Sequence, residues 1–140
     1  MSAAETDLTL LRPELRLASI SDREIVLPFE EAMGALYYFR TKEIGVLGWE
    51  DWLLLRDGKK THSTIQGTVS VEPESNENWS DYVNRSLNFA LETIEKDHQA
   101  FLKSSESSRG KLHFCITPLT QREWVLRSNT AQKGRDLGAV

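Results

Sequence analysis

Residues 78–103 read NWSDYVNRSLNFALETIEKDHQAFLK, and the spacing of their side chains predicts one long amphipathic helix. Positions three and four residues apart fall on a single face of a helical wheel, which consists of Trp79, Val83, Leu87, Ala90, Leu91, Ile94, His98, Phe101 and Leu102. At about 1.5 Å per residue, such a helix would be roughly 35–40 Å long. Because a helix of this length cannot bury its apolar face alone, other elements of the chain must cover it.

A second, uncharged strip lies opposite this face of the helix. It contains Tyr82 and Phe89, with Ser86 and Thr93 beside them, while the charged side chains occupy the remaining side. One interpretation is that the helix is sandwiched between a sheet and a second helix over residues 28–42. The other is that Tyr82 and Phe89 belong to a surface that binds a partner, because aromatic side chains are enriched at interfaces.

The remaining chain supplies strand patterns around this helix. Residues 49–56 and 61–71 are β-rich runs on either side of Asp57-Gly58, which predicts a hairpin with a four-residue loop. Residues 111–117 alternate in polarity and predict a further strand, while residues 28–42 have helical spacing. We therefore predict an α+β fold, in which a mostly antiparallel sheet of four to five strands is packed on one face by two helices.

The boundaries of the domain follow from the length of the chain and from its polar stretches. At 140 residues the chain is expected to form a single α+β domain over residues 1–140. Residues 1–7 and 129–140 are expected to be disordered or loosely attached. Residues 104–110, which are rich in serine, are expected to form a solvated loop.

Three other stretches have patterns that fit more than one structure. Residues 8–20 alternate around a proline and indicate an edge strand or an extended segment. Residues 21–24 match a helix capping box, so either one kinked helix spans residues 22–42, or a short extended piece precedes a helix that begins with Pro28 in its first turn. We favour the second alternative. Residues 120–128 fit a capping box or a strand, and we favour a strand paired with residues 111–117.

Composition and charge narrow the class of partner. The chain is 39% hydrophobic and 27% charged, as in ordinary soluble domains, and contains no apolar run long enough to span a membrane. Its net charge of −4 combines an acidic body with a basic end, because residues 107–140 carry 6 basic and 2 acidic groups. Nucleic acid is therefore an unlikely ligand. One cysteine and the lack of a signal-peptide pattern lead us to expect a cytoplasmic protein.

No motif in the sequence indicates catalysis, a metal site or a cofactor. Phosphate-binding glycine loops, nucleophile elbows and paired metal-binding motifs are all missing, which favours a protein that is not an enzyme. Glu95 and His98 have the Glu-x-x-His spacing of di-metal helix bundles, but only one copy is present, so a packed histidine is favoured. His113 and Cys115 share a strand face without a second pair of ligands. His62 and Ser63 are adjacent on a predicted strand and point to opposite faces, so they cannot pair as base and nucleophile.

The leading functional hypothesis is a small, acidic, non-catalytic protein that acts by binding a protein partner. Immunity proteins, antitoxins and secretion chaperones are similar in composition only. Carboxylates would attract a basic partner, and aromatic side chains would anchor it. The candidate partner-binding residues are Tyr38, Trp49, Trp52, Tyr82 and Phe89. The alternative is a small-molecule-binding protein or small enzyme with a pocket lined by histidine and tyrosine between the sheet and the helices. A homo-oligomer is compatible with either hypothesis.

Overall fold

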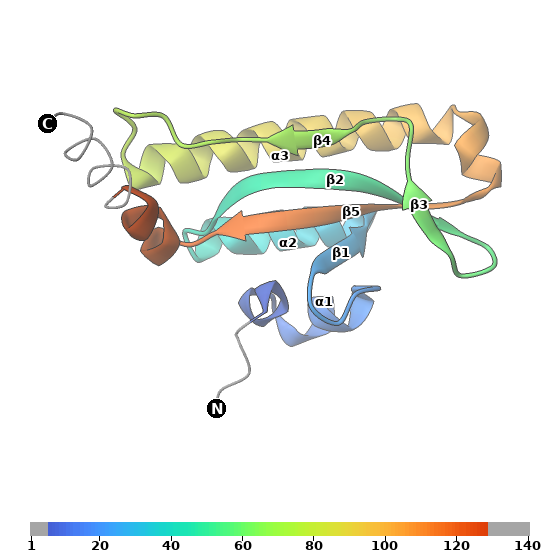
Figure 1. Cartoon of the computed structure of the whole chain (residues 1–140), viewed down its shortest axis with the longest axis horizontal. Coiled ribbons are helices and arrows are strands. Elements are labelled where there is room, and N and C mark those ends of the chain that lie inside the picture. Colours follow the sequence, from blue (N-terminus) through green and yellow to red (C-terminus); the bar gives the residue numbers. More distant parts are fainter. Residues whose placement is uncertain (1–5, 129–140) are drawn as a thin grey trace, which may run out of the picture.

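Helix α3 (Trp79–Leu102) runs along most of the molecule and confirms the predicted long helix (Figure 1). Asn78 is its N-cap, and the side-chain oxygen of Asn78 accepts a hydrogen bond from the backbone N–H of Asp81 at 2.8 Å. Most of the predicted apolar face is buried, but Leu102 is 54% exposed. Three further residues of the helix are buried: Tyr82, Ser86 and Asp97. The second strip of the helix is therefore also covered over part of its length.

A five-stranded antiparallel sheet confirms the α+β class in this computed structural model, which describes residues 6–128. The strands are β1 (Ile25–Pro28), β2 (Gly45–Leu55), β3 (Lys60–His62), β4 (Thr68–Ser70) and β5 (Gly110–Leu119). Their order is β1-β5-β2-β3, and β4 pairs with the same edge of β2 as β3 does. The long strands β2 and β5 therefore form the centre of the sheet, and the three short strands pair with their outer edges.

Helices α2 (Phe29–Thr41) and α3 lie behind the sheet in Figure 1. The core fills the space between these two layers and contains Trp49 and Leu53 of β2, Phe114 and Ile116 of β5, Leu36 and Phe39 of α2, and Leu87 and Ile94 of α3. Alternate residues of a strand point to opposite faces, so Glu50, Trp52 and Leu54 project from the other face of β2. We call this the front face. It also carries Thr68, Ser70, His113, Cys115 and Thr117.

The predicted strand over residues 61–71 is only partly correct, because the structure divides it into the two short strands β3 and β4. The Ser63 backbone N–H donates to the Asp51 carbonyl oxygen at 3.0 Å, and the ladder resumes with Thr68 opposite Glu50. Residues 64–67 do not pair with β2 and form a loop. The predicted hairpin has a loop of four residues as expected, but the loop covers residues 56–59 and not 57–60, and Gly58 adopts a φ of +88° there.

The start of the chain is helical, so the predicted edge strand over residues 8–20 is wrong. It forms η1 (Asp7–Leu10) and α1 (Pro13–Ala18), with the proline in the first turn, where its missing N–H is not needed. Leu11, in the extended link between the two helices, and Leu15 of α1 both reach the core, where they are 1% and 7% exposed. Residues 1–7 were expected to be disordered or loosely attached. Residues 1–5 lie outside the described range, whereas Asp7 begins η1.

The favoured alternative for residues 21–42 agrees with the structure to within one residue. The Ser21 hydroxyl oxygen accepts the Glu24 backbone N–H at 3.0 Å, but this contact stabilises a bend before β1 and not the start of a helix. Pro28 is the N-cap of α2, so the helix begins one residue later than predicted. Glu30 and Glu31 lie in its first turn, where they complement the positive end of the helix.

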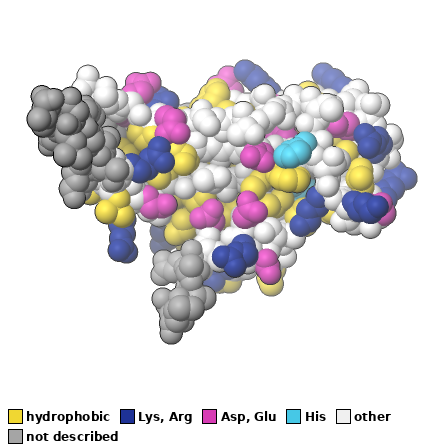
Figure 2. Space-filling model, viewed as in Figure 1, with side chains coloured by type: hydrophobic (Ala, Val, Ile, Leu, Met, Phe, Trp, Pro, Cys, Tyr) yellow, Lys and Arg dark blue, Asp and Glu magenta, His cyan; other side chains and the backbone are white. Residues whose placement is uncertain are grey.

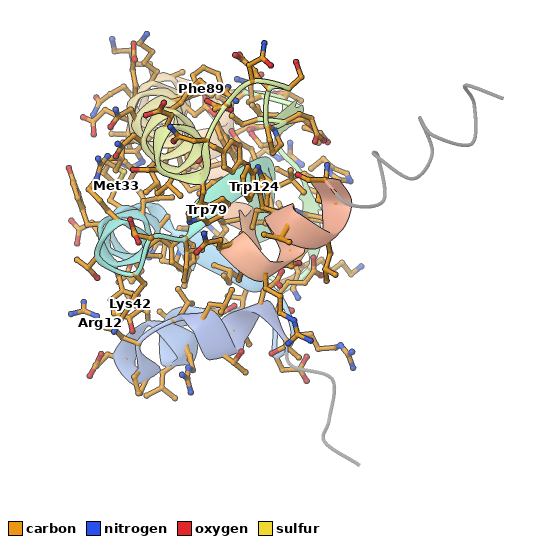
Figure 3. All side chains as sticks on the ribbon, turned by 90° about the vertical axis from the view of Figure 1, so that its left-hand side faces the viewer. Arg12, Met33, Lys42, Trp79, Phe89 and Trp124 are labelled. Atoms are coloured by element: carbon orange, nitrogen blue, oxygen red, sulfur yellow. The ribbon has the colours of Figure 1, made fainter. Side chains whose placement is uncertain are left out.

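The favoured strand over residues 120–128 is wrong, because residues 121–128 are helical. The capping box is formed: the Glu123 backbone N–H donates to the Thr120 hydroxyl oxygen at 3.2 Å, and the Thr120 N–H donates to a Glu123 carboxylate oxygen at 3.1 Å. Trp124 packs on Trp79, with ring centroids 5.7 Å apart (Figure 3). Residues 129–140, which were also expected to be loosely attached, lie outside the described range.

The predicted solvated loop over residues 104–110 is only partly correct. Residues Ser105–Ser108 form the short helix η2, and Glu106 within it is only 5% exposed. The Glu106 carboxylate accepts hydrogen bonds from the Ser63 hydroxyl at 2.6 Å and from the Thr64 N–H and hydroxyl, each at 2.9 Å. These bonds hold the loop over residues 64–67 against η2 and explain the break between β3 and β4.

Candidate functional site

Two of the five candidate partner-binding residues lie in the core. Trp49 is 1% exposed and Tyr82 is fully buried, so neither can reach a partner in this conformation. The Tyr82 hydroxyl lies 3.0 Å from the Val46 carbonyl oxygen and 2.9 Å from that of Val71. The strip therefore meets the sheet at Tyr82. Of the two interpretations of this strip, packing inside the fold is the one that applies to Tyr82. Helix α2 contacts a different side of α3, where Arg40 donates to Asn84 and Asn88.

The other three candidates are accessible but do not form a single patch. Phe89 is 43% exposed and packs on Trp49 from α3, with centroids 5.7 Å apart. Tyr38 is half-buried on α2, and its ring lies 5.6 Å from the Arg12 guanidinium and 5.7 Å from the Lys42 ammonium. Figure 3 shows these two cations close together beneath α2. The third candidate, Trp52, is half-buried on the front face.

A shallow hollow of about 190 Å³ lies on the front face between β2, β4 and β5. Three carboxylates line it, from Glu24, Glu50 and Glu72, together with the polar residues Thr68, Ser70, Cys115 and Thr117. None of the described residues that line the hollow is a lysine or an arginine. Figure 2 shows the front face: acidic side chains lie across its middle among hydrophobic ones, and basic side chains gather towards its right-hand end.

The acidic character of this hollow arises from three separate segments. Glu24 precedes β1, Glu50 projects forward from β2, and Glu72 follows β4. Glu72 is paired with Arg127, 2.5 Å away, which ties the helix over residues 121–128 to the rim. Burial raises the pKa of Asp7 nearby, and repulsion from Glu123 and Glu24 adds to the effect. Asp7 is thus close enough to Glu24 and Glu123 to be affected by their charge.

The single cysteine lies in the floor of the hollow and is unsuited to nucleophilic chemistry. Cys115 is 8% exposed, and its Sγ donates to a Glu24 carboxylate oxygen 3.4 Å away. Burial, together with the negative charge of Glu24, raises the pKa of the Cys115 thiol to about 12. The reactive thiolate is therefore scarce at neutral pH.

The three histidines do not converge on one site. His62 and His113 flank Trp52 from the neighbouring strands β3 and β5, and the His62 ring lies 4.4 Å from that of Trp52. His113 is 3% exposed, and burial lowers its pKa, so the ring is neutral at physiological pH. His98 lies on the other side of the sheet, in α3. No group of three or more histidine, cysteine or acidic side chains within residues 6–128 could hold a metal ion.

His98 lines a larger cleft of about 500 Å³ between the start of α2, the end of α3 and β5. Its ring is stacked on that of Phe29, with centroids 3.9 Å apart and an interplanar angle of 4°. The cleft combines apolar side chains, including Phe101 and Leu102, with Glu30, Glu31 and Lys111. The buried Nδ1 of His98 has no hydrogen-bond partner among the described residues.

A pair of buried carboxyl groups was not anticipated from the sequence. Asp51 of β2 is 1% exposed and Asp97 of α3 is 6% exposed. Burial raises the pKa of Asp51 well above its usual 3.8, and the hydrogen bond that its protonated form can donate to Asp97, together with repulsion from Asp97 and Glu106, raises it further. Burial also raises the pKa of Asp97, although its hydrogen bond with Asp51 opposes this shift. At least one of the two groups is therefore protonated at neutral pH.

The chain matches no known protein-family model, no curated protein and no solved structure. Within residues 6–128, no helix has both the length and the apolar composition needed to cross a membrane.

Proposed function

We propose that the protein binds a basic segment of a partner protein on the front face of its sheet. The acidic hollow is the observation that carries this proposal, because Glu24 and Glu50 line it with no lysine or arginine among its described lining residues, while Glu72 at its rim is paired with Arg127. A surface with one sign of charge attracts a segment of the opposite sign and speeds its association. The rest of the chain is also mostly acidic, which likewise attracts a basic segment.

The size of the hollow and its neighbour Trp52 favour a protein segment as the ligand. At about 190 Å³, the hollow is smaller than the roughly 300–1,000 Å³ typical of small-molecule sites. Trp52 lies two residues after Glu50 on the same strand, so both side chains project from the front face. A partly buried tryptophan beside charged side chains is typical of the residues that anchor protein interfaces.

The proposal can be tested with a fluorescently labelled lysine-rich peptide and two matched double variants. Glu24→Gln/Glu50→Gln removes two charges from the hollow, whereas Glu43→Gln/Glu95→Gln removes two from exposed positions at the end of α2 and on α3. We expect the first variant to weaken peptide binding by about tenfold or more, equivalent to about 1.4 kcal/mol, and the second to leave binding nearly unchanged. Fluorescence anisotropy at low and at physiological salt measures the dissociation constants.

Equal weakening by the two double variants would show that net charge alone attracts the peptide, and would contradict a site on the front face. Absence of peptide binding by the unaltered protein at low salt would contradict the proposal directly.

The cleft beside His98 supports a second candidate function, the binding of a small molecule. Its volume of about 500 Å³ falls within the usual range for such sites, and its lining combines the stacked rings of Phe29 and His98 with charged side chains. Titration with small aromatic acids and amines, followed by amide NMR shifts, is the test. We expect shifts around Phe29 and His98 that His98→Asn abolishes. Shifts confined to the front face, or none at all, would remove this candidate.

A further inference from the structure

The two buried carboxyl groups of Asp51 and Asp97 meet between β2 and α3 without a basic partner. Neither side-chain oxygen of Asp51, nor Oδ2 of Asp97, has a hydrogen-bond donor among the described residues. Carboxylates only accept hydrogen bonds, so two ionised groups in this position would repel each other without any compensation. A hydrogen bond between them exists only when one of the two carries a proton.

The surroundings offer nothing else that could neutralise the pair. The charged groups that act on Asp51 are Asp97 of α3 and Glu106 of η2, and both are acidic. Neither α2 nor β5 contributes a charged group that acts on the pair, and the residue opposite Asp51 on β5 is Phe114. No described set of three side chains here could hold a metal ion either. The proton is therefore the neutralising charge that the described structure provides.

The pair joins parts of the fold that are otherwise tied by few polar contacts. Asp51 lies where the outer strand is broken, and its carbonyl oxygen accepts the Ser63 N–H at 3.0 Å. Asp97 lies in the last two turns of α3, shortly before η2. Glu106 of η2 then holds Ser63 and Thr64 through three hydrogen bonds. The end of α3, η2 and the loop over residues 64–67 thus form one connected region above β2.

We propose that Asp51 and Asp97 form a proton-operated latch, in which one shared proton holds the end of α3 against β2. With the proton bound, one carboxyl O–H donates to the other carboxylate. When the proton is lost to solvent at higher pH, two carboxylates face each other in a buried space. The end of α3, η2 and residues 63–67 then separate from β2, while the rest of the sheet stays paired.

The test compares the pH dependence of unfolding in three proteins. The folded pair holds a proton that the unfolded chain releases above its ordinary pKa, so the unfolding constant of the unaltered protein should rise by up to about tenfold per pH unit between pH 5.5 and 8. Asp51→Asn supplies a permanent N–H donor to Asp97, and we expect this variant to lose the rise of the unfolding constant with pH. Asp22→Asn, at an exposed position, removes the same charge and should keep the slope of the unaltered protein.

A local measurement identifies the region that opens. Hydrogen exchange, corrected for its intrinsic pH dependence, should accelerate with pH at residues 63–67 and 99–108 and stay constant in β1. Carboxyl ¹³C NMR of the unaltered protein should show one aspartate that titrates above pH 6. An Asp51→Asn slope equal to that of the unaltered protein, or titration of every aspartate below pH 5, would overturn the latch. Should Asp51→Asn fail to fold, Asp97→Asn and the ¹³C titration decide the question.

Discussion

The Tyr82 hydroxyl joins α3 to two separate parts of the chain, the start of β2 and the residue after β4. The carbonyl oxygens of Val46 and Val71 both lie within 3.0 Å of it, and because a hydroxyl carries one hydrogen, they share it. The ring also determines which residue can occupy position 45. A Cβ added to Gly45 would lie 2.6 Å from the ring carbon Cε2, so the close approach of helix and strand requires glycine there.

Replacement of Tyr82 by phenylalanine should lower the free energy of unfolding by about 1–2 kcal/mol. The ring remains, but two buried carbonyl groups lose their shared donor. Tyr37→Phe, at a site that is 58% exposed, is the control and should have almost no effect. Urea unfolding monitored by circular dichroism measures both. Equal stability of the two variants would mean that the Tyr82 hydroxyl makes no net contribution to folding.

At the scale of elements, the helix over residues 121–128 contacts the body through Trp124 and Arg127. The Trp124 ring packs on Trp79 at the start of α3, and the Arg127 guanidinium pairs with Glu72 after β4. The ion pair is half-exposed on both sides and contributes little by itself. The aromatic contact is therefore the main attachment, and it places the helix next to the acidic hollow.

Trp124→Ala should lower the stability of the protein by about 1–3 kcal/mol, less than a fully buried tryptophan would, because Trp124 is only partly buried. Val125→Ala, at a neighbouring position that is 42% exposed, should change stability by less than about 0.5 kcal/mol. Thermal unfolding measures both variants, and hydrogen exchange of residues 121–128 reports whether the helix still docks. Unchanged exchange in Trp124→Ala would contradict the role of this side chain.

The elements that the sequence predicted correctly are those with long local patterns. Residues 78–103 repeat one spacing over many turns, so tertiary contacts could not alter the outcome. Residues 61–71 contain no local sign of their break, because the hydrogen bonds that cause it come from Glu106, more than 40 residues further along the chain. The short helices near the start of the chain depend on leucines that pack against distant parts of the core.

The candidate site was less predictable than the fold, for a geometric reason. A helical wheel separates the strips of α3 but does not say which strip meets the sheet, so the sequence left Tyr82 either packed inside a sandwich or on a partner-binding surface. The buried acids, in contrast, had a signal in the sequence. Asp51 alternates with Trp49 and Leu53 on one strand face, and Asp97 continues the spacing of Ile94 and Phe101. Both positions therefore follow the pattern of core residues.

Across the whole molecule, carboxyl groups are shifted in opposite directions. Burial raises the pKa of Glu106, but hydrogen bonds from Ser63 and Thr64 outweigh this and hold the pKa below its usual value. Its contribution to stability is therefore present above pH 4.5 and is lost as the pH falls through the lowered pKa. Asp51 and Asp97 have raised pKa values, so their effect on stability has the opposite pH dependence. The stability that they contribute is complete below pH 3.8 and is lost as the pH rises.

We therefore predict that the melting temperature passes through a maximum in the mildly acidic range and falls on both sides. Glu106→Gln should flatten the acidic side, since the residue no longer changes charge there. Asp51→Asn should flatten the alkaline side. Calorimetry between pH 3 and 9 measures all three curves. A melting temperature that rises steadily towards pH 9 would be inconsistent with the buried pair.

Both borders of the sheet are unfavourable for the addition of another strand. At β1, the Val26 N–H donates to the Ser19 hydroxyl oxygen at 3.1 Å, and the Val26 carbonyl accepts the Ile20 N–H at 3.1 Å, so the outward-pointing groups are already used. At the other border, the loop over residues 64–67 leaves two strands of three residues each in place of one long strand. A long, continuous edge is what lets identical chains stack into fibrils, and this sheet offers none. The same interruption that ties the loop to Glu106 thus leaves only short strand edges at this border for a second chain to pair with.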